Sequence, residues 1–84
     1  MTKPLIINGV TLRSSSKKNQ SIMNKAVRAM IAYNKANDIR NKAEDEGLNL
    51  SLFNRQCENL FDRYLQYAEE LSQADIKLIE KVLF

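Results

Sequence analysis

The sequence predicts a mainly α fold, with two long antiparallel helices, a shorter C-terminal helix and a small N-terminal β-hairpin arm. Three observations lead to this prediction. An Asn-Gly pair divides two β-favouring runs, apolar residues recur at helical spacing over most of residues 16–83, and only two of the 84 residues are glycine. At this length we expect one helical domain over residues 1–84. Its core is modest, and association into a homodimer is a common remedy for that.

The predicted arm covers residues 1–15, and its centre is the pair Asn8-Gly9. The runs Leu5-Ile6-Ile7 and Val10-Thr11-Leu12 flank this pair, which suits a type I′ turn because both central residues need positive φ. An isolated two-stranded hairpin is marginal in water, so its apolar side chains must rest on the helices or pair with another chain. The candidate oligomer-interface residues are Leu5, Ile7, Val10 and Leu12, together with Leu83 and Phe84 at the C-terminal end.

The first long helix is predicted over residues 16–46. Ser14, Ser15 and Ser16 supply a turn and an N-cap, since a serine hydroxyl can accept a hydrogen bond from a first-turn N–H. Gly47 follows at the position where helices commonly end. One face carries an apolar stripe that we expect to be buried: Ile22, Ala26, Ala29, Tyr33, Ala36 and Ala43, widened by Val27, Met30 and Ile39.

Two further helices are predicted over residues 50–71 and 73–83. The second helix has one broad apolar face, which contains Phe53, Cys57, Leu60, Phe61, Tyr64, Leu65, Tyr67 or Ala68, and Leu71. Ser72 and Asp75 resemble a capping box, in which Ser72 serves the N–H of Asp75 and the carboxylate reaches back. In the third helix we expect Ile76, Ile79 and Val82 or Leu83 to point inward.

The net charge of +3 conceals a strong asymmetry along the chain. Residues 1–43 contain nine Lys or Arg and one acid, a balance of +8, whereas residues 44–84 contain four and nine, a balance of −5. If the halves fold against one another, the charges can be complementary solvated faces. The alternative is a basic surface for a polyanion such as nucleic acid.

The basic residues of the first helix are ordered along it. Five of them follow one another at intervals of 7, 3, 7 and 7, which keeps them near one side of the helix: Lys18, Lys25, Arg28, Lys35 and Lys42. The candidate residues for binding DNA or RNA are Arg13, Lys17, Lys18, Lys25, Arg28, Lys35 and Lys42. Tyr33, Tyr64 and Tyr67 could stack on bases, but their helical spacing favours core or boundary positions.

The sequence offers little for catalysis, and we predict that the chain is not an enzyme. It has no histidine, and its only cysteine, Cys57, falls on a predicted apolar face where a thiol is inert. Glu58 and Asp62 stand at i and i+4, but a solvated, salt-bridged pair is a simpler interpretation than a metal site. Gly9 and Gly47 each have a structural use, which leaves no phosphate-binding loop. We expect neither a metal nor a cofactor.

A lone cysteine fits a reducing cytoplasm. We recognise no secretory signal, and no apolar run approaches the roughly 20 residues of a membrane span, so no membrane contact is expected. The leading prediction is a small non-catalytic regulatory or protein-interaction module that acts through a helical surface, as a homodimer and with another protein. The alternative is a nucleic-acid-binding accessory protein that uses the basic face of the first helix. Small size and richness in Lys and Asn would suit a phage, plasmid or other mobile element.

Overall fold

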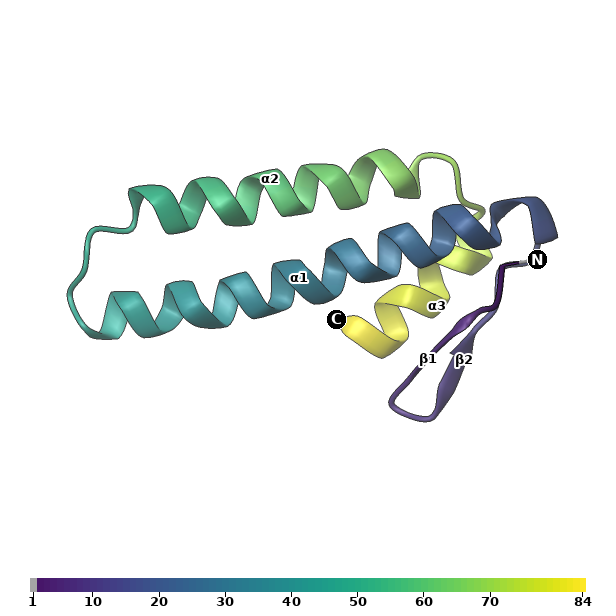
Figure 1. Cartoon of the computed structure of the whole chain (residues 1–84), viewed down its shortest axis with the longest axis horizontal. Coiled ribbons are helices and arrows are strands. Elements are labelled where there is room, and N and C mark those ends of the chain that lie inside the picture. The colour runs from purple at the N-terminus through teal and green to yellow at the C-terminus, as the bar shows by residue number, and fades with distance from the viewer. Residues whose placement is uncertain (1) are drawn as a thin grey trace.

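The computed structural model describes residues 2–84 and shows a short hairpin followed by three helices (Figure 1). The predicted mainly α fold with a hairpin arm is confirmed. In chain order the elements are β1 (Leu5–Ile7), β2 (Val10–Leu12), a single 3-10 turn η1 (Lys17–Asn19), α1 (Gln20–Asp45), α2 (Ser51–Ala68) and α3 (Gln73–Leu83).

The two long helices, α1 and α2, run antiparallel side by side and define the long axis of a 45 × 25 × 21 Å molecule (Figure 1). The short helix α3 packs against the N-terminal part of α1, beside the hairpin. It does not extend to the end of the pair where α1 and α2 are connected (Figure 1). The C-terminal part of α1 therefore packs mainly against α2.

The hairpin has the predicted turn and register. Asn8 and Gly9 have φ values of 52° and 77°, the positive values that a type I′ turn requires. Leu5 pairs with Leu12, and Ile7 pairs with Val10, so these four side chains share one face of the ribbon. Leu12 on that face is 0% exposed, whereas Ile6 on the other face is 68% exposed. The hairpin thus packs on the helices of its own chain.

The start of the first helix differs from the prediction. The α-helix begins at Gln20 rather than at residue 16, and the Ser16 hydroxyl caps neither η1 nor α1. The neighbouring serines instead serve a distant carboxylate: Ser14 Oγ donates to Asp75 Oδ2 at 2.6 Å, and the Ser15 N–H donates to Asp75 Oδ1 at 2.8 Å. A buried carboxylate without hydrogen-bond donors is costly. The free N–H groups of the first helical turn can instead bond to water.

Two buried amides tie the arm to α1. Gln20 Nε2 donates to the carbonyl oxygen of Leu12 at 3.0 Å, while Gln20 Oε1 accepts from the Ser14 N–H at 2.8 Å. Asn24 Nδ2 donates to the carbonyl oxygen of Lys3 at 2.8 Å, and Asn24 Oδ1 accepts from Gln20 at 3.0 Å. These bonds give partners to backbone groups of the arm, of which the Leu12 carbonyl is buried and the others are partly buried.

The end of α1 is as predicted to within one residue. Gly47 has φ 73°, and its N–H donates to the carbonyl oxygen of Glu44 at 3.0 Å. The Leu48 N–H donates to the carbonyl oxygen of Ala43 at 2.9 Å, which completes a Schellman motif. Glycine supplies the left-handed backbone at this position without a Cβ penalty.

The later boundaries confirm the third helix and shorten the second. The α2 helix ends at Ala68 rather than at residue 71, and α3 covers the predicted residues 73–83. Ser72 Oγ accepts from the Asp75 N–H at 3.2 Å, as an N-cap should. The prediction that the Asp75 carboxylate reaches back to the start of its own helix is wrong. Its two oxygens accept hydrogen bonds from Ser14 and Ser15 instead.

The core lies where α1, α2, α3 and the hairpin meet. Its buried residues are Leu12, Met23, Ala26, Val27, Ala29, Met30, Tyr64, Ala68, Leu71 and Ile79. Two residues expected on buried faces are exposed instead: Ile39 at 54% and Leu65 at 44%. At about 100° per residue, Ile39 lies about 180° around α1 from the buried Met30, so it faces away from the core. The structure therefore buries only part of the predicted stripe.

Candidate functional site

The seven cations that the sequence predicts to bind nucleic acid are all exposed, and they form two groups. Four of them share one side of α1 and are called here the basic face: Lys25, Arg28, Lys35 and Lys42. At about 100° per residue they fall within an arc of about 100° around the helix. The buried residues Met23, Val27 and Met30 lie on the other side of α1.

The remaining three cations precede α1. Lys17 and Lys18 belong to η1, and Arg13 directly follows β2. Arg13 and Lys17 line a cavity of about 650 Å³ beside the arm, together with polar groups of Ser14, Ser15 and Gln20. No residue of the basic face lines this cavity.

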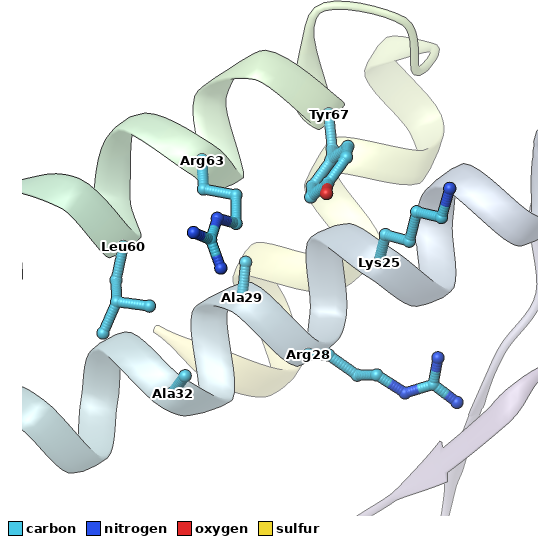
Figure 2. A pocket seen from close by; sticks show the side chains of 7 residues that line it. All are labelled: Lys25, Arg28, Ala29, Ala32, Leu60, Arg63 and Tyr67. Atoms are coloured by element: carbon cyan, nitrogen blue, oxygen red, sulfur yellow. The ribbon is translucent and has the colours of Figure 1, made fainter.

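A groove of about 230 Å³ lies between α1 and α2, at one end of the basic face (Figure 2). Ala29, Ala32 and Leu60 form its apolar floor, and Tyr67 lies beside them. The small alanines leave the space between the helices open. Three cationic residues line the groove, Lys25, Arg28 and Arg63, and the guanidinium of Arg28 extends away from α2 (Figure 2).

Arg63 is not among the cations that the sequence predicts to bind nucleic acid. Its side chain extends from α2 toward α1, between Leu60 and Tyr67 (Figure 2). A signal for this placement existed in the spacing, since Arg63 follows Leu60 by three residues and precedes Tyr67 by four. Arg63 therefore flanks the apolar face of α2 and joins the cations of α1 across the groove.

The two acids of α2, and Glu69 directly after the helix, are turned away from this groove. At about 100° per residue, Glu58, Asp62 and Glu69 lie about 100 to 140° around the helix from Arg63. All three are exposed. The groove side of the α1–α2 pair therefore carries cations, and these acids lie on other sides of α2.

Ion pairing does not neutralise the basic face. Within residues 2–84 a single ion pair lies inside 4.0 Å, and it joins Arg40 Nη1 to Glu44 Oε2 at 3.1 Å within α1. No ion pair of the described chain connects α1 to α2. The expectation that the two halves are complementary charged faces thus gains no support from direct pairing.

Three other side chains that could act as a nucleophile, acid or base lie inside the protein. Cys57 is a free, buried thiol on the inner side of α2. The Asp75 carboxylate is 2% exposed and accepts from two serines. The Tyr64 hydroxyl is buried without a hydrogen-bond partner, and burial raises the pKa of Tyr64, with a further contribution from the negative charge of Glu80. Among the residues that the structure describes, no three potential metal ligands cluster.

The candidate oligomer-interface residues contribute unequally to the surface. Leu12 is inside the core, and Leu5, Ile7 and Leu83 pack against it. Val10 and Phe84 remain exposed, although the Phe84 ring centroid lies 6.1 Å from that of Tyr64. The structure thus leaves Val10 and Phe84, with Ile6 on the outer hairpin face, as available apolar surface.

No helix within residues 2–84 is long and apolar enough to cross a bilayer. No protein-family model, curated protein or solved structure matches this chain. The geometry of the basic face and of the groove is therefore what supports a functional proposal.

Proposed function

We propose that this protein is a small, non-catalytic regulatory interaction module of the cytoplasm that acts through the exposed side of the α1–α2 pair, and that nucleic acid is the partner bound there. One observation carries the proposal. The four cations of the basic face and Arg63 share this side, and within residues 2–84 none of them has a carboxylate within 4.0 Å. Unpaired cations on one surface attract a polyanion and gain from the release of its counterions.

The length of the basic face suits a nucleic-acid backbone. From Lys25 to Lys42 the helix rises about 25 Å at 1.5 Å per residue. This distance corresponds to about seven phosphates of one strand at a rise of 3.4 Å. No base-reading motif accompanies the cations, so we expect binding that is largely independent of base sequence.

The state of the reactive groups supports a non-catalytic role. The Cys57 thiol is buried. The carboxylate of Asp75 is already engaged by the two serines that hold the arm. Catalysis needs a nucleophile or base within reach of a substrate, and these two groups are directed into the fold.

Fluorescence anisotropy with labelled oligonucleotides of DNA and RNA tests the proposal. Binding should weaken steeply between 50 and 200 mM salt, because each phosphate contact releases counterions. The double variant Lys25→Glu/Lys35→Glu should lose binding. The control Arg55→Glu/Lys77→Glu changes the net charge equally, at exposed positions outside the basic face, and should retain most of the affinity. No binding at 50 mM salt, or equal losses in both variants, would refute the proposal.

Self-association is a second candidate, favoured by the open hairpin. Both strands have an unpaired edge within the described chain, and Ile6 and Val10 are exposed there. Such an edge can pair with another copy or with a different protein. Sedimentation should then give a dimer mass that Ile6→Lys reduces to that of a monomer. A monomeric mass for the unmodified chain at high concentration would rule out the homodimer.

A further inference from the structure

We infer that the groove between α1 and α2 is a subsite for single-stranded nucleic acid, in which Arg63 contacts a backbone phosphate and Tyr67 stacks on an unpaired base. This inference rests on the proposed function and specifies where on the α1–α2 pair a single strand is held. It assigns roles to two residues of the acidic half of the chain.

The groove combines two kinds of surface that a single strand also combines. Lys25, Arg28 and Arg63 supply positive charge around it, and the floor of Ala29, Ala32 and Leu60 is apolar. A single strand carries phosphates beside bases whose faces are exposed, and such faces stack on aromatic side chains. A duplex hides those faces within its stack. The cations would serve either form, whereas the apolar floor and Tyr67 serve only the unpaired one.

The position of Tyr67 fits this role. Its half-buried ring is fixed against the core on one side, and it lines the groove on the other (Figure 2). Tyr64, by contrast, is fully inside the core. A ring that is already held by packing loses little conformational entropy when a base stacks on it.

A second copy of the chain fits the groove poorly. A two-fold contact centred there would bring the cations Lys25, Arg28 and Arg63 of both copies together, and like charges in an interface are unfavourable. An acidic protein helix would match the charge but not the continuation of the cations along α1. Lys35 and Lys42 extend the row in one line, as a linear backbone requires.

The first test compares the affinities of a 20-nucleotide oligothymidine and a 20-base-pair duplex by fluorescence anisotropy at 50 mM salt. Polyglutamate serves as a competitor. We expect the single strand to bind at least tenfold more tightly. Equal or tighter binding of the duplex would overturn the inference and leave the proposed function standing. Absence of binding to both would overturn the two together. Polyglutamate could also displace the labelled strand as effectively, per charge, as unlabelled oligothymidine does. This result would identify an acidic protein as the partner class and would overturn the inference.

The second test compares Arg63→Gln with Arg55→Gln. Both arginines are exposed on α2, and neither has a carboxylate of the described chain within 4.0 Å, but only Arg63 lines the groove. We expect Arg63→Gln to weaken oligothymidine binding several-fold and to reduce the slope of log affinity against log salt by about 0.7, the value for one phosphate contact of a single strand. Arg55→Gln should change neither quantity. Equal behaviour of the two variants would contradict the role of Arg63.

The third test separates stacking from charge. Tyr67→Leu should weaken oligothymidine binding about 5- to 150-fold, the range for loss of one stacked base, without changing the salt slope. Tyr67→Phe keeps the ring and should bind like the unmodified protein. Thermal unfolding of each variant verifies the fold. If Tyr67→Leu does not fold, the salt slope of Arg63→Gln remains the test of the subsite. Unchanged affinity in a folded Tyr67→Leu variant would refute the stacking role.

Discussion

Ser14 and Asp75 are 61 positions apart in the chain, yet Ser14 Oγ donates to Asp75 Oδ2 at 2.6 Å. The second carboxylate oxygen accepts from the Ser15 N–H, and Ser15 Oγ lies 2.9 Å from Ser72 Oγ. Asp75 is in the first turn of α3, where the helix dipole favours negative charge. One buried carboxylate thus joins the end of the arm to the start of the last helix.

Replacement of this carboxylate should destabilise the whole fold. We expect Asp75→Asn to lower the free energy of unfolding by about 1.5 to 3 kcal/mol, the range for hydrogen bonds to a charged group. Urea unfolding followed by circular dichroism measures the change. Asp62→Asn is the matched control, because Asp62 is exposed on α2. Equal stability of the two variants would show that the connection between arm and α3 contributes nothing.

The two faces of the hairpin should respond differently to truncation. Leu12 is fully buried, so Leu12→Ala should cost about 2 to 5 kcal/mol of unfolding free energy. Ile6 is opposite in orientation and exposed, so Ile6→Ala should cost less than about 1 kcal/mol. Thermal or urea unfolding distinguishes them. Similar losses at both positions would be inconsistent with a hairpin that rests on its own helices.

The connection between α1 and α2 depends on the backbone of Gly47. Its φ of 73° disfavours any residue with a Cβ, and Gly47→Ala should lower the unfolding free energy by about 1 to 2 kcal/mol. Gly47→Asn should lose less, because asparagine tolerates the left-handed region better. Urea unfolding of the pair gives the comparison. A Gly47→Ala variant as stable as the parent would argue against the Schellman motif.

Tyr64 should make stability depend on pH in the alkaline range. Burial, and then the charge of Glu80, raises the pKa of Tyr64 above its ordinary value of 10.0. The unfolded chain therefore releases this proton first, and the free energy of unfolding is unaffected below about pH 10 and falls as the pH rises above it. Circular dichroism in urea across this range measures the fall.

Two variants test this assignment. Tyr64→Phe removes the ionisable hydroxyl, which has no hydrogen-bond partner to lose, and should remove its part of the alkaline fall. Glu80→Gln should lower the pKa of Tyr64 toward its ordinary value and make the fall smaller. An unchanged alkaline profile in Tyr64→Phe would place the responsible group elsewhere.

The sequence by itself determined the features that depend on near neighbours in the chain. The Asn8-Gly9 turn, the end of α1 at Gly47 and the start of α3 at Ser72 were all predicted correctly. Each depends on backbone angles or hydrogen bonds that span only a few residues, and the residue types involved have strong preferences for them.

Only the tertiary structure decided which partners meet over long distances. The serines before α1 were predicted to cap it, but Asp75 takes their hydrogen bonds, because the packing of α3 brings its buried carboxylate to the arm. Ile39 is exposed because it lies on the side of α1 that faces away from the core, about 180° around the helix from the buried Met30. Arg63 joins the cations of α1 because the two helices pack with that side of α2 toward α1. Local preferences carry no information about such contacts, which depend on how the helices pack together.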